Sequence, residues 1–229
     1  MDGVKEAVRN NALWCDAVSR AHGADGQFLE GLWISEGPTP PFFPNAITLS
    51  PDDSGRQLAK VEMLVDGGRL ENWGVKDSYC TLELGGHGFQ QVLKGEWILR
   101  VPQAKGGRGK IGSTPWRVVT TERELSAWEE KWHRDNGQEC TTRVFFRTML
   151  EDPRLSFWGA FEGTRIVAGA ISFRTGCVVG VSNIFPIGGF GLQCIHEIGR
   201  HYPDFPLVGY EDNKDLEAIS ALGFQPSVQ

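Results

Sequence analysis

The sequence predicts an α+β fold built on a mixed sheet and divided into two halves by a linker. A segment at 105–115 is rich in glycine and lysine and almost free of apolar residues, which is typical of a linker. The residues before it alternate between helical and strand-like apolar patterns. The residues after it are more regular, with a three-strand meander followed by a helix, a strand and a helix. We therefore expect an N-terminal α/β half over 1–104 and a C-terminal domain over 116–229.

The composition is that of a globular protein whose partners are not strongly charged polymers. Of the 229 residues, 40% are hydrophobic and 23% are charged, so one large domain or two small ones would bury a sizeable core. The formal net charge is -6, and acidic and basic residues are mixed along the chain. This balance argues against nucleic acid or an anionic membrane surface as the main partner.

The pattern of cysteines and the length of the apolar stretches indicate the cellular compartment of the protein. The five cysteines are an odd number without a C-x-x-C pair, which argues against a disulfide framework and against a zinc site. No stretch reaches the ~18 to 20 apolar residues of a membrane span, and the N-terminus lacks the pattern of a secretory signal. We therefore expect a cytoplasmic protein with no metal and no membrane partner.

In the first half, apolar spacing and turn residues mark the elements in order. Val4, Val8 and Trp14 share one face of a helix that ends at Gly23. Ser50, followed by a proline and an acid, is typical of the start of a second helix. The pattern predicts helices over 4–22 and 52–65 and strands over 26–37, 45–50, 78–84 and 95–101.

The second half begins with a strand and a well-marked helix. Thr121 and Glu124 form a capping box, and Leu125, Trp128 and Trp132 mark the buried face of the helix that follows. The pattern beyond predicts a short helix over 143–152 and strands over 116–121, 155–161, 165–173, 177–185 and 206–211, with a helix after each of the last two.

Two glycine clusters are candidates for a phosphate-binding loop. The first, GGRGKIG at 106–112, contains G-x-G-x-x-G, but a strand-like segment follows it where a dinucleotide loop needs a helix. We interpret it as part of the linker. The second, at 185–194, runs from a strand into a helix through Gly188, Gly189 and Gly191. Glycines at a helix start let free backbone amides approach an anion, as binding of a pyrophosphate requires.

The order of elements over roughly 116–226 resembles that of the GNAT superfamily of acyl-CoA-dependent N-acyltransferases. In that family the loop carries Arg or Gln followed by x-x-G-x-G or x-x-G-x-A, and its amides bind the pyrophosphate of coenzyme A. Gly189 and Gly191 match the glycines of this motif. Pro186 stands in place of the Arg or Gln, and the loop is short.

The closing helix is similar to the family in part. Gly223 and Phe224 match the Gly-Phe that ends the family's last helix. Ile219 stands where the family often has a tyrosine that protonates the leaving thiolate. The strand 177–185 contains no acid, although the family often has its general base, a glutamate, on that strand. The resemblance is therefore stronger in fold than in catalytic residues.

The resemblance implies an N-acyltransferase that moves an acetyl or other acyl group from coenzyme A to an amine of a small molecule or peptide. The amine would attack the thioester carbonyl directly, with the carbonyl polarised by a strand amide. Asn183, Tyr210 and Glu211 would line the acceptor site, where water or Glu211 would relay the amine proton. No metal is implied. The acetyl-CoA or other acyl-CoA co-substrate would contact Val181, Ser182, Ile184, Phe185, Gly188, Gly189, Phe190, Gly191 and Asn213.

Two other functions stay open. A catalytically inactive GNAT-fold protein, serving as a binding or scaffold protein, would account for the departures at Pro186 and Ile219. An aminoacyl-tRNA-dependent transferase on tandem GNAT-like halves is disfavoured by the acidic net charge.

The first half is interpreted as a degenerate, truncated GNAT-like repeat. Its order of strand, helix, strand, Gly-Phe and closing strand echoes the second half, with Gly88-Phe89 corresponding to Gly223-Phe224. The first half continues past its Gly-Phe into a strand, whereas the sequence ends five residues after Phe224. We expect the final strand of the second half to be missing, or to be supplied by the first half or by a partner subunit in a homodimer.

Overall fold

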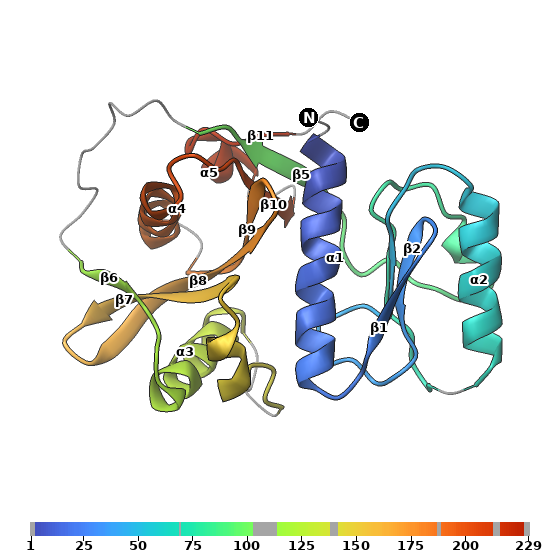
Figure 1. Cartoon of the computed structure of the whole chain (residues 1–229), viewed down its shortest axis with the longest axis horizontal. Helices are drawn as coiled ribbons and strands as arrows, with labels where there is room; N and C mark the ends of the chain where they lie inside the picture. Colours follow the sequence, from blue (N-terminus) through green and yellow to red (C-terminus); the bar gives the residue numbers. More distant parts are fainter. Residues whose placement is uncertain are drawn as a thin grey trace. The chain divides into compact units, whose positions relative to one another are not determined.

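The computed structural model describes residues 3–68, 70–102, 114–137, 142–186, 189–212 and 216–226, and divides them into two compact units. The N-terminal unit extends to Lys94 and the C-terminal unit begins at Gly95 (Figure 1). Within the described ranges, no helix has the length and apolar character needed to cross a membrane.

The N-terminal unit is a small sheet with a helix on each face (Figure 1). Strands β1, β2 and β3 are antiparallel, and β4 is parallel to β3. Trp33 and Ile47 pack against α1, whereas their neighbours Leu32 and Ala46 pack against α2, because successive strand residues point to opposite faces. The elements are α1 (Gly3–Ala21), β1 (Gly26–Leu29), β2 (Leu32–Ser35), β3 (Ala46–Thr48), α2 (Ser54–Asp66), β4 (Val75–Lys76) and the 3-10 helix η1 (Leu84–His87).

Two strand predictions in this unit are wrong. The single strand predicted over 26–37 is a hairpin, because the chain turns at Gly31, whose φ of 73° suits glycine. The strand predicted over 78–84 does not form. The carboxylate of Asp77 accepts hydrogen bonds from the backbone amides of Tyr79 and Leu82, so these amides bond a side chain instead of a strand.

The C-terminal unit is a seven-stranded sheet in the order β11-β5-β10-β9-β8-β7-β6. All neighbours are antiparallel except β9 and β10. The elements are β5 (Gly95–Arg100), β6 (Trp116–Val118), α3 (Glu122–Asp135), the 3-10 helix η2 (Arg147–Glu151), β7 (Leu155–Glu162), β8 (Arg165–Thr175), β9 (Val178–Phe185), α4 (Gly189–His201), β10 (Leu207–Asp212), α5 (Leu216–Ser220) and β11 (Gln225–Pro226).

Helices cover both faces of this sheet. Trp128 of α3 contacts the rings of Phe157 and Phe185, and its indole N–H donates to the carbonyl of Trp158. The side chain of Trp158 points the other way and packs with Cys194 of α4. Adjacent residues of β7 thus contact different helices, which places α3 and α4 on opposite faces.

The helix predicted over 143–152 is shorter than expected. Buried Glu129 of α3 accepts hydrogen bonds from the amides of Val144 and Phe145, and holds this segment extended as far as η2. One half of the predicted capping box is present, since Thr121 Oγ1 accepts a hydrogen bond of 3.3 Å from the amide of Glu124. The Glu124 carboxylate accepts from the amide of Thr120 instead of that of Thr121.

Strand β5 corrects the predicted boundary between the halves. It lies between β10 and β11 and pairs with β10 along its whole length, from Arg100 opposite Leu207 to Gly95 opposite Asp212 (Figure 1). The strand that the second half lacks is therefore supplied by the segment before the linker. The boundary falls after Lys94 instead of at 104. Most of the predicted linker at 105–115 lies outside the described residues.

The two units repeat one order of elements. Each has a helix, three antiparallel strands, a second helix and a strand parallel to the third. Gly88 and Gly223 follow the next helical turn of each unit with φ values of 83° and 81°. Phe89 and Phe224 then pack on the respective cores. The described part of the first half therefore has the same order of elements as the second.

Candidate functional site

The candidate site lies where β9 and β10 diverge. The two strands pair only at Val179 with Leu207 and at Gly180 with Val208, although both continue beyond these residues. A register shift on β9 opposite Gly169 and Ile171 marks a β-bulge, and Asn183 within it has a φ of 53°. The bulge bends β9, so beyond the ladder the edge of β9 that faces β10 has no strand partner among the described residues.

Glycine at position 209 keeps the base of this opening narrow. A Cβ added to Gly209 would lie 3.2 Å from the carbonyl oxygen of Val181 and 3.3 Å from the side chain of Ile98. The backbones of β9 and β10 therefore remain in close contact at Val181, and the strands separate after this point.

The glycines at the start of α4 have different surroundings. Outside the backbone of its own helix and its chain neighbours, no atom of a described residue lies within 4 Å of a Cβ placed on Gly189, so the described surroundings leave this side of the helix start open. A Cβ on Gly191 would lie 2.9 Å from Cγ2 of Ile184 and 3.3 Å from the carbonyl oxygen of Pro186. Gly191 thus allows α4 to pack closely on β9, whereas Gly189 leaves room for a ligand. Gly188, also predicted to bind the co-substrate, lies outside the described residues.

The first turn of α4 is suited to an anion. The leading amides of a helix have no acceptor within it, and among the described residues those of Gly189 and Phe190 donate no hydrogen bond outside it. The helix dipole adds a partial positive charge at this end. The described part of the turn contains no basic side chain, so a bound phosphate would interact with backbone groups.

Two polar residues of α4 were not predicted as site residues. The buried atoms Gln193 Oε1 and His196 Nε2 have no hydrogen-bond partner among the described residues. Their i, i+3 spacing, one turn beyond the glycines, puts them on one side of the helix. That spacing after the glycine loop is the signal that could have identified them.

The predicted catalytic residues come from two strands, Tyr210 and Glu211 from β10 and Asn183 from β9. The hydroxyl of Tyr210 accepts a hydrogen bond of 2.9 Å from the amide of Gly95, and its ring contacts Trp97 edge to face at 4.9 Å. Both partners belong to β5, on the side of β10 away from β9. Glu211 lies opposite Glu96 of β5. Asn183 lies in the bulge of β9, and no hydrogen bond between described residues joins it to Tyr210 or Glu211.

The predicted co-substrate residues of β9 are partly core residues. The side chains of Val181 and Phe185 are buried, and those of Ser182 and Ile184 are half-buried. Their backbone, beyond the ladder with β10, is what remains for a ligand. Asn213 lies outside the described residues.

Ile219 and Cys194 have structural roles. Ile219, at the position of the family's tyrosine, is buried in the core with Phe224. Cys194 is fully buried in the same core, and burial raises the pKa of its thiol well above the ordinary value. A thiol in this state does not supply a nucleophilic thiolate near neutral pH.

The equivalent position of the N-terminal unit is closed. Beyond the β3–β4 ladder, Thr48 Oγ1 donates to Asp77 and accepts a hydrogen bond of 2.7 Å from the amide of Ser78. The start of α2 follows two acidic residues, Asp52 and Asp53. Carboxylates at this position disfavour a phosphate. Among the described residues, the opening between parallel strands therefore belongs to the C-terminal unit.

Comparisons with known proteins identify similar folds. No protein-family model matches the chain, and no curated protein matches it in sequence. A GCN5-related N-acetyltransferase from Kribbella flavida is 14% identical, with a TM-score of 0.63 over 96% of this chain and 92% of that chain. A functionally unknown conserved protein from Staphylococcus epidermidis is also 14% identical, with a TM-score of 0.50 over 85% of this chain and 80% of that chain. At this identity the likeness concerns the fold alone.

Proposed function

We propose, from the premise that the chain has the GNAT fold predicted from its sequence, that it is an acyl-CoA-dependent N-acyltransferase. The observation that carries the proposal is the opening between β9 and β10 next to the start of α4. The unpaired edge of β9 would bond the pantetheine chain, and the amides at Gly189 and Phe190 would hold the pyrophosphate. Acetyl-CoA or another acyl-CoA is the donor, and an amine of a small molecule or peptide is the acceptor.

The proposed reaction needs no covalent intermediate. The neutral amine attacks the thioester carbonyl, a C–N bond forms, and a backbone amide of β9 stabilises the oxyanion. The C–S bond then breaks, and coenzyme A leaves as the thiolate. The proton lost by the amine passes to Glu211 or to water, and a proton from solvent neutralises the thiolate because Ile219 cannot supply one.

Titration calorimetry with acetyl-CoA tests binding, and Gly189→Asp tests its location. An aspartate at this open position adds a negative charge where the pyrophosphate would lie, and we expect the affinity to fall tenfold or more. Gly55→Asp is the matched control, since Gly55 also lies in open space in the first turn of a helix, α2. An acid is tolerated at both helix starts, so both variants should fold. Equal affinity of the two variants, or no binding by the wild type, would contradict the proposal.

A binding or scaffold role without catalysis is the second candidate. The buried Ile219 favours it, because this side chain stands where the family often has the tyrosine that protonates the leaving thiolate, and it has no proton to donate. Release of free thiol from acetyl-CoA, measured against a panel of small amines and peptides, separates the two candidates. Tight binding without release above the uncatalysed rate would favour the scaffold role.

A further inference from the structure

Arg100, the last residue of β5, carries a charged group into the C-terminal unit, where it is only 8% exposed. It lies opposite Leu207 of β10, and Leu207 is buried in the core that α4 covers. Because paired residues of neighbouring strands point to the same face of a sheet, the Arg100 side chain extends toward α4. A Cβ on Gly199 of α4 would lie 3.5 Å from each of its terminal nitrogens, which agrees with this direction.

The guanidinium group of Arg100 has five N–H donors, and no hydrogen bond or ion pair joins it to a described residue. Glu197, the acidic residue of α4, pairs with Arg200 instead. Burial lowers the pKa of Arg100, because it disfavours the charged form of the group. Buried charges in proteins are ordinarily paired. The donors of Arg100 are therefore available to an anion from solution.

Glycine at position 199 leaves space beside this group. An added Cβ would be in ordinary contact with the guanidinium, at 3.5 Å from Nη1 and Nη2 and 3.7 Å from Cζ. The low exposure of Arg100 restricts this space to a small ligand. The cost of removing an ion from water rises with the square of its charge, so a monovalent anion enters this setting beside Leu207 more readily than a divalent one.

The end of α4 does not reverse the sign of the local charge. The C-terminal end of a helix carries about half a negative charge, against the full positive charge of the guanidinium. The last turn of α4 also contains the basic residues Arg200 and His201. The balance beside Arg100 therefore favours an anion over a cation.

This position is separate from the proposed pyrophosphate site. Gly189 begins α4, and Gly199 follows ten residues later, which corresponds to about 15 Å along the helix axis. An anion beside Arg100 would therefore not occupy the place of acyl-CoA. Its failure in a test would leave the proposed acyl transfer unaffected.

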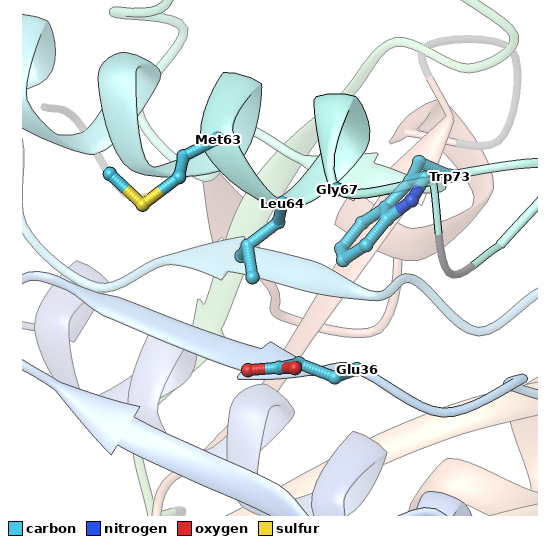
Figure 2. A pocket seen from close by; sticks show the side chains of 5 residues that line it. All are labelled: Glu36, Met63, Leu64, Gly67 and Trp73. Carbon is cyan, nitrogen blue, oxygen red and sulfur yellow. The ribbon is translucent and has the colours of Figure 1, made fainter.

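The cavity of about 180 Å³ in the N-terminal unit provides a weaker basis for a ligand. Leu64 and Trp73 approach it from one side and Glu36 from the other (Figure 2). Glu36, the charged residue of this lining, already takes part in another interaction. Its carboxylate is therefore not available to select a ligand by charge, whereas no described residue engages the guanidinium of Arg100.

We infer that Arg100 binds a small monovalent anion such as chloride, between the end of β5 and the C-terminal end of α4. The N–H groups of the guanidinium donate to the ion, and the ion compensates the buried charge. Because the folded protein binds the ion and the unfolded chain has no such site, chloride stabilises the C-terminal unit.

Thermal unfolding of the full-length protein in sodium chloride and in sodium gluconate of equal ionic strength tests the inference. Gluconate has the same charge but is too large for a space of this size. We expect replacement of 300 mM gluconate by chloride to raise the melting temperature of the wild type by about 2–4 °C more than that of Arg100→Met, with half of this effect below about 100 mM chloride. In gluconate alone the charge has no counter-ion, so Arg100→Met should be the more stable protein there.

The same dependence on chloride in the wild type and in Arg100→Met would overturn the inference. Arg165→Met is the matched control and should keep the wild-type dependence, because Arg165 is largely exposed and pairs with Glu162. Gly189→Asp should keep it too. Loss of the dependence in Gly189→Asp would place the ion at the start of α4 and would equally contradict the site at Arg100.

Gly199→Ala tests the space without removing the charge. Alanine favours a helix more than glycine does, and its Cβ would be in ordinary contact with the guanidinium, so the variant should fold. We expect its affinity for chloride, from the midpoint of the same titration, to fall at least fivefold. Gly55→Ala is the control, because a Cβ on Gly55 of α2 meets no described atom within 4 Å. Equal chloride midpoints for the two alanine variants would show that the ion does not lie beside Gly199.

Discussion

The backbone amide of Gly95 donates a hydrogen bond of 2.9 Å to the hydroxyl of Tyr210, which lies 115 residues further along the chain. Gly95 is the first residue of β5, and Tyr210 belongs to β10, the strand on one side of the candidate site. The segment that precedes the linker therefore holds in place a residue predicted to be catalytic. The C-terminal unit depends on this segment for its sheet.

Gly95→Ala should destabilise the protein by about 1–3 kcal/mol. The added Cβ would lie 2.3 Å from the carbonyl oxygen of Glu211 and 2.9 Å from Cε1 of Tyr210, so the backbone of β5 or β10 must move. Urea unfolding at constant temperature measures the change in the free energy of unfolding. Gly85→Ala is the control, since a Cβ there meets no atom within 4 Å. Equal free energies of unfolding of the two variants would show that β5 accommodates the added methyl group without loss of stability.

A fragment that starts at Gly95 should fold, whereas one that starts at Thr114 should not. The shorter fragment lacks β5, which pairs with six residues of β10 and buries Trp97 and Ile98. Without it, β10 becomes an exposed edge next to an uncovered core. Circular dichroism during urea titration should show a cooperative transition for the longer fragment alone. Cooperative unfolding of the shorter one would mean that β5 is dispensable.

The pairing of β5 with β10 could not be predicted from the sequence. GEWILRV is recognisable as a strand, because apolar and aromatic residues dominate it. Its partner β10 is more than a hundred residues away, and no local pattern specifies that pairing. The position of the Tyr210 hydroxyl depends on β5, so it could not be predicted either.

Other elements follow from local patterns. The capping box at Thr121 and the meander over β7, β8 and β9 are predictable because spacing and alternation specify them. The error at 78–84 has a local cause that periodicity does not detect, namely the Asp77 carboxylate binding nearby amides. In the candidate site, the G-x-G spacing identifies Gly189 and Gly191, but their different surroundings depend on the packing of α4 against Ile184.

Glu124→Gln should remove part of the acid sensitivity of the protein. The hydrogen bond from Arg117 is the main cause that lowers the pKa of Glu124 from 4.5 to about 2. Because the folded pKa is depressed, the stabilisation is complete above about pH 4.5 and is lost as the pH falls toward 2. The melting temperature of the wild type should therefore fall more steeply over this window than that of the variant. Glu130→Gln, an exposed change on the same helix, should leave the slope unaltered. Parallel curves for wild type and Glu124→Gln would refute the assignment.

Arg100 is a buried charge for which the described part of the chain provides no ionic partner. Its side chain is 8% exposed, and it forms no hydrogen bond or ion pair with any described residue. Its guanidinium nitrogens would lie 3.5 Å from a Cβ on Gly199 of α4, and burial lowers its pKa. Leu207 lies opposite it on β10. The charge is therefore removed from water, and no carboxylate among the described residues compensates for the desolvation.

Arg100→Met should for this reason stabilise the protein, by about 1 kcal/mol or more. Methionine keeps most of the aliphatic volume that packs beside Leu207 and removes the desolvated charge. Arg165→Met is the comparison, because Arg165 is largely exposed and pairs with Glu162 at the surface, where the expected change is close to zero. Thermal and urea unfolding of both variants measure the difference. A loss of stability in Arg100→Met would mean that the guanidinium makes a favourable interaction with the C-terminal end of α4 that exceeds its desolvation cost.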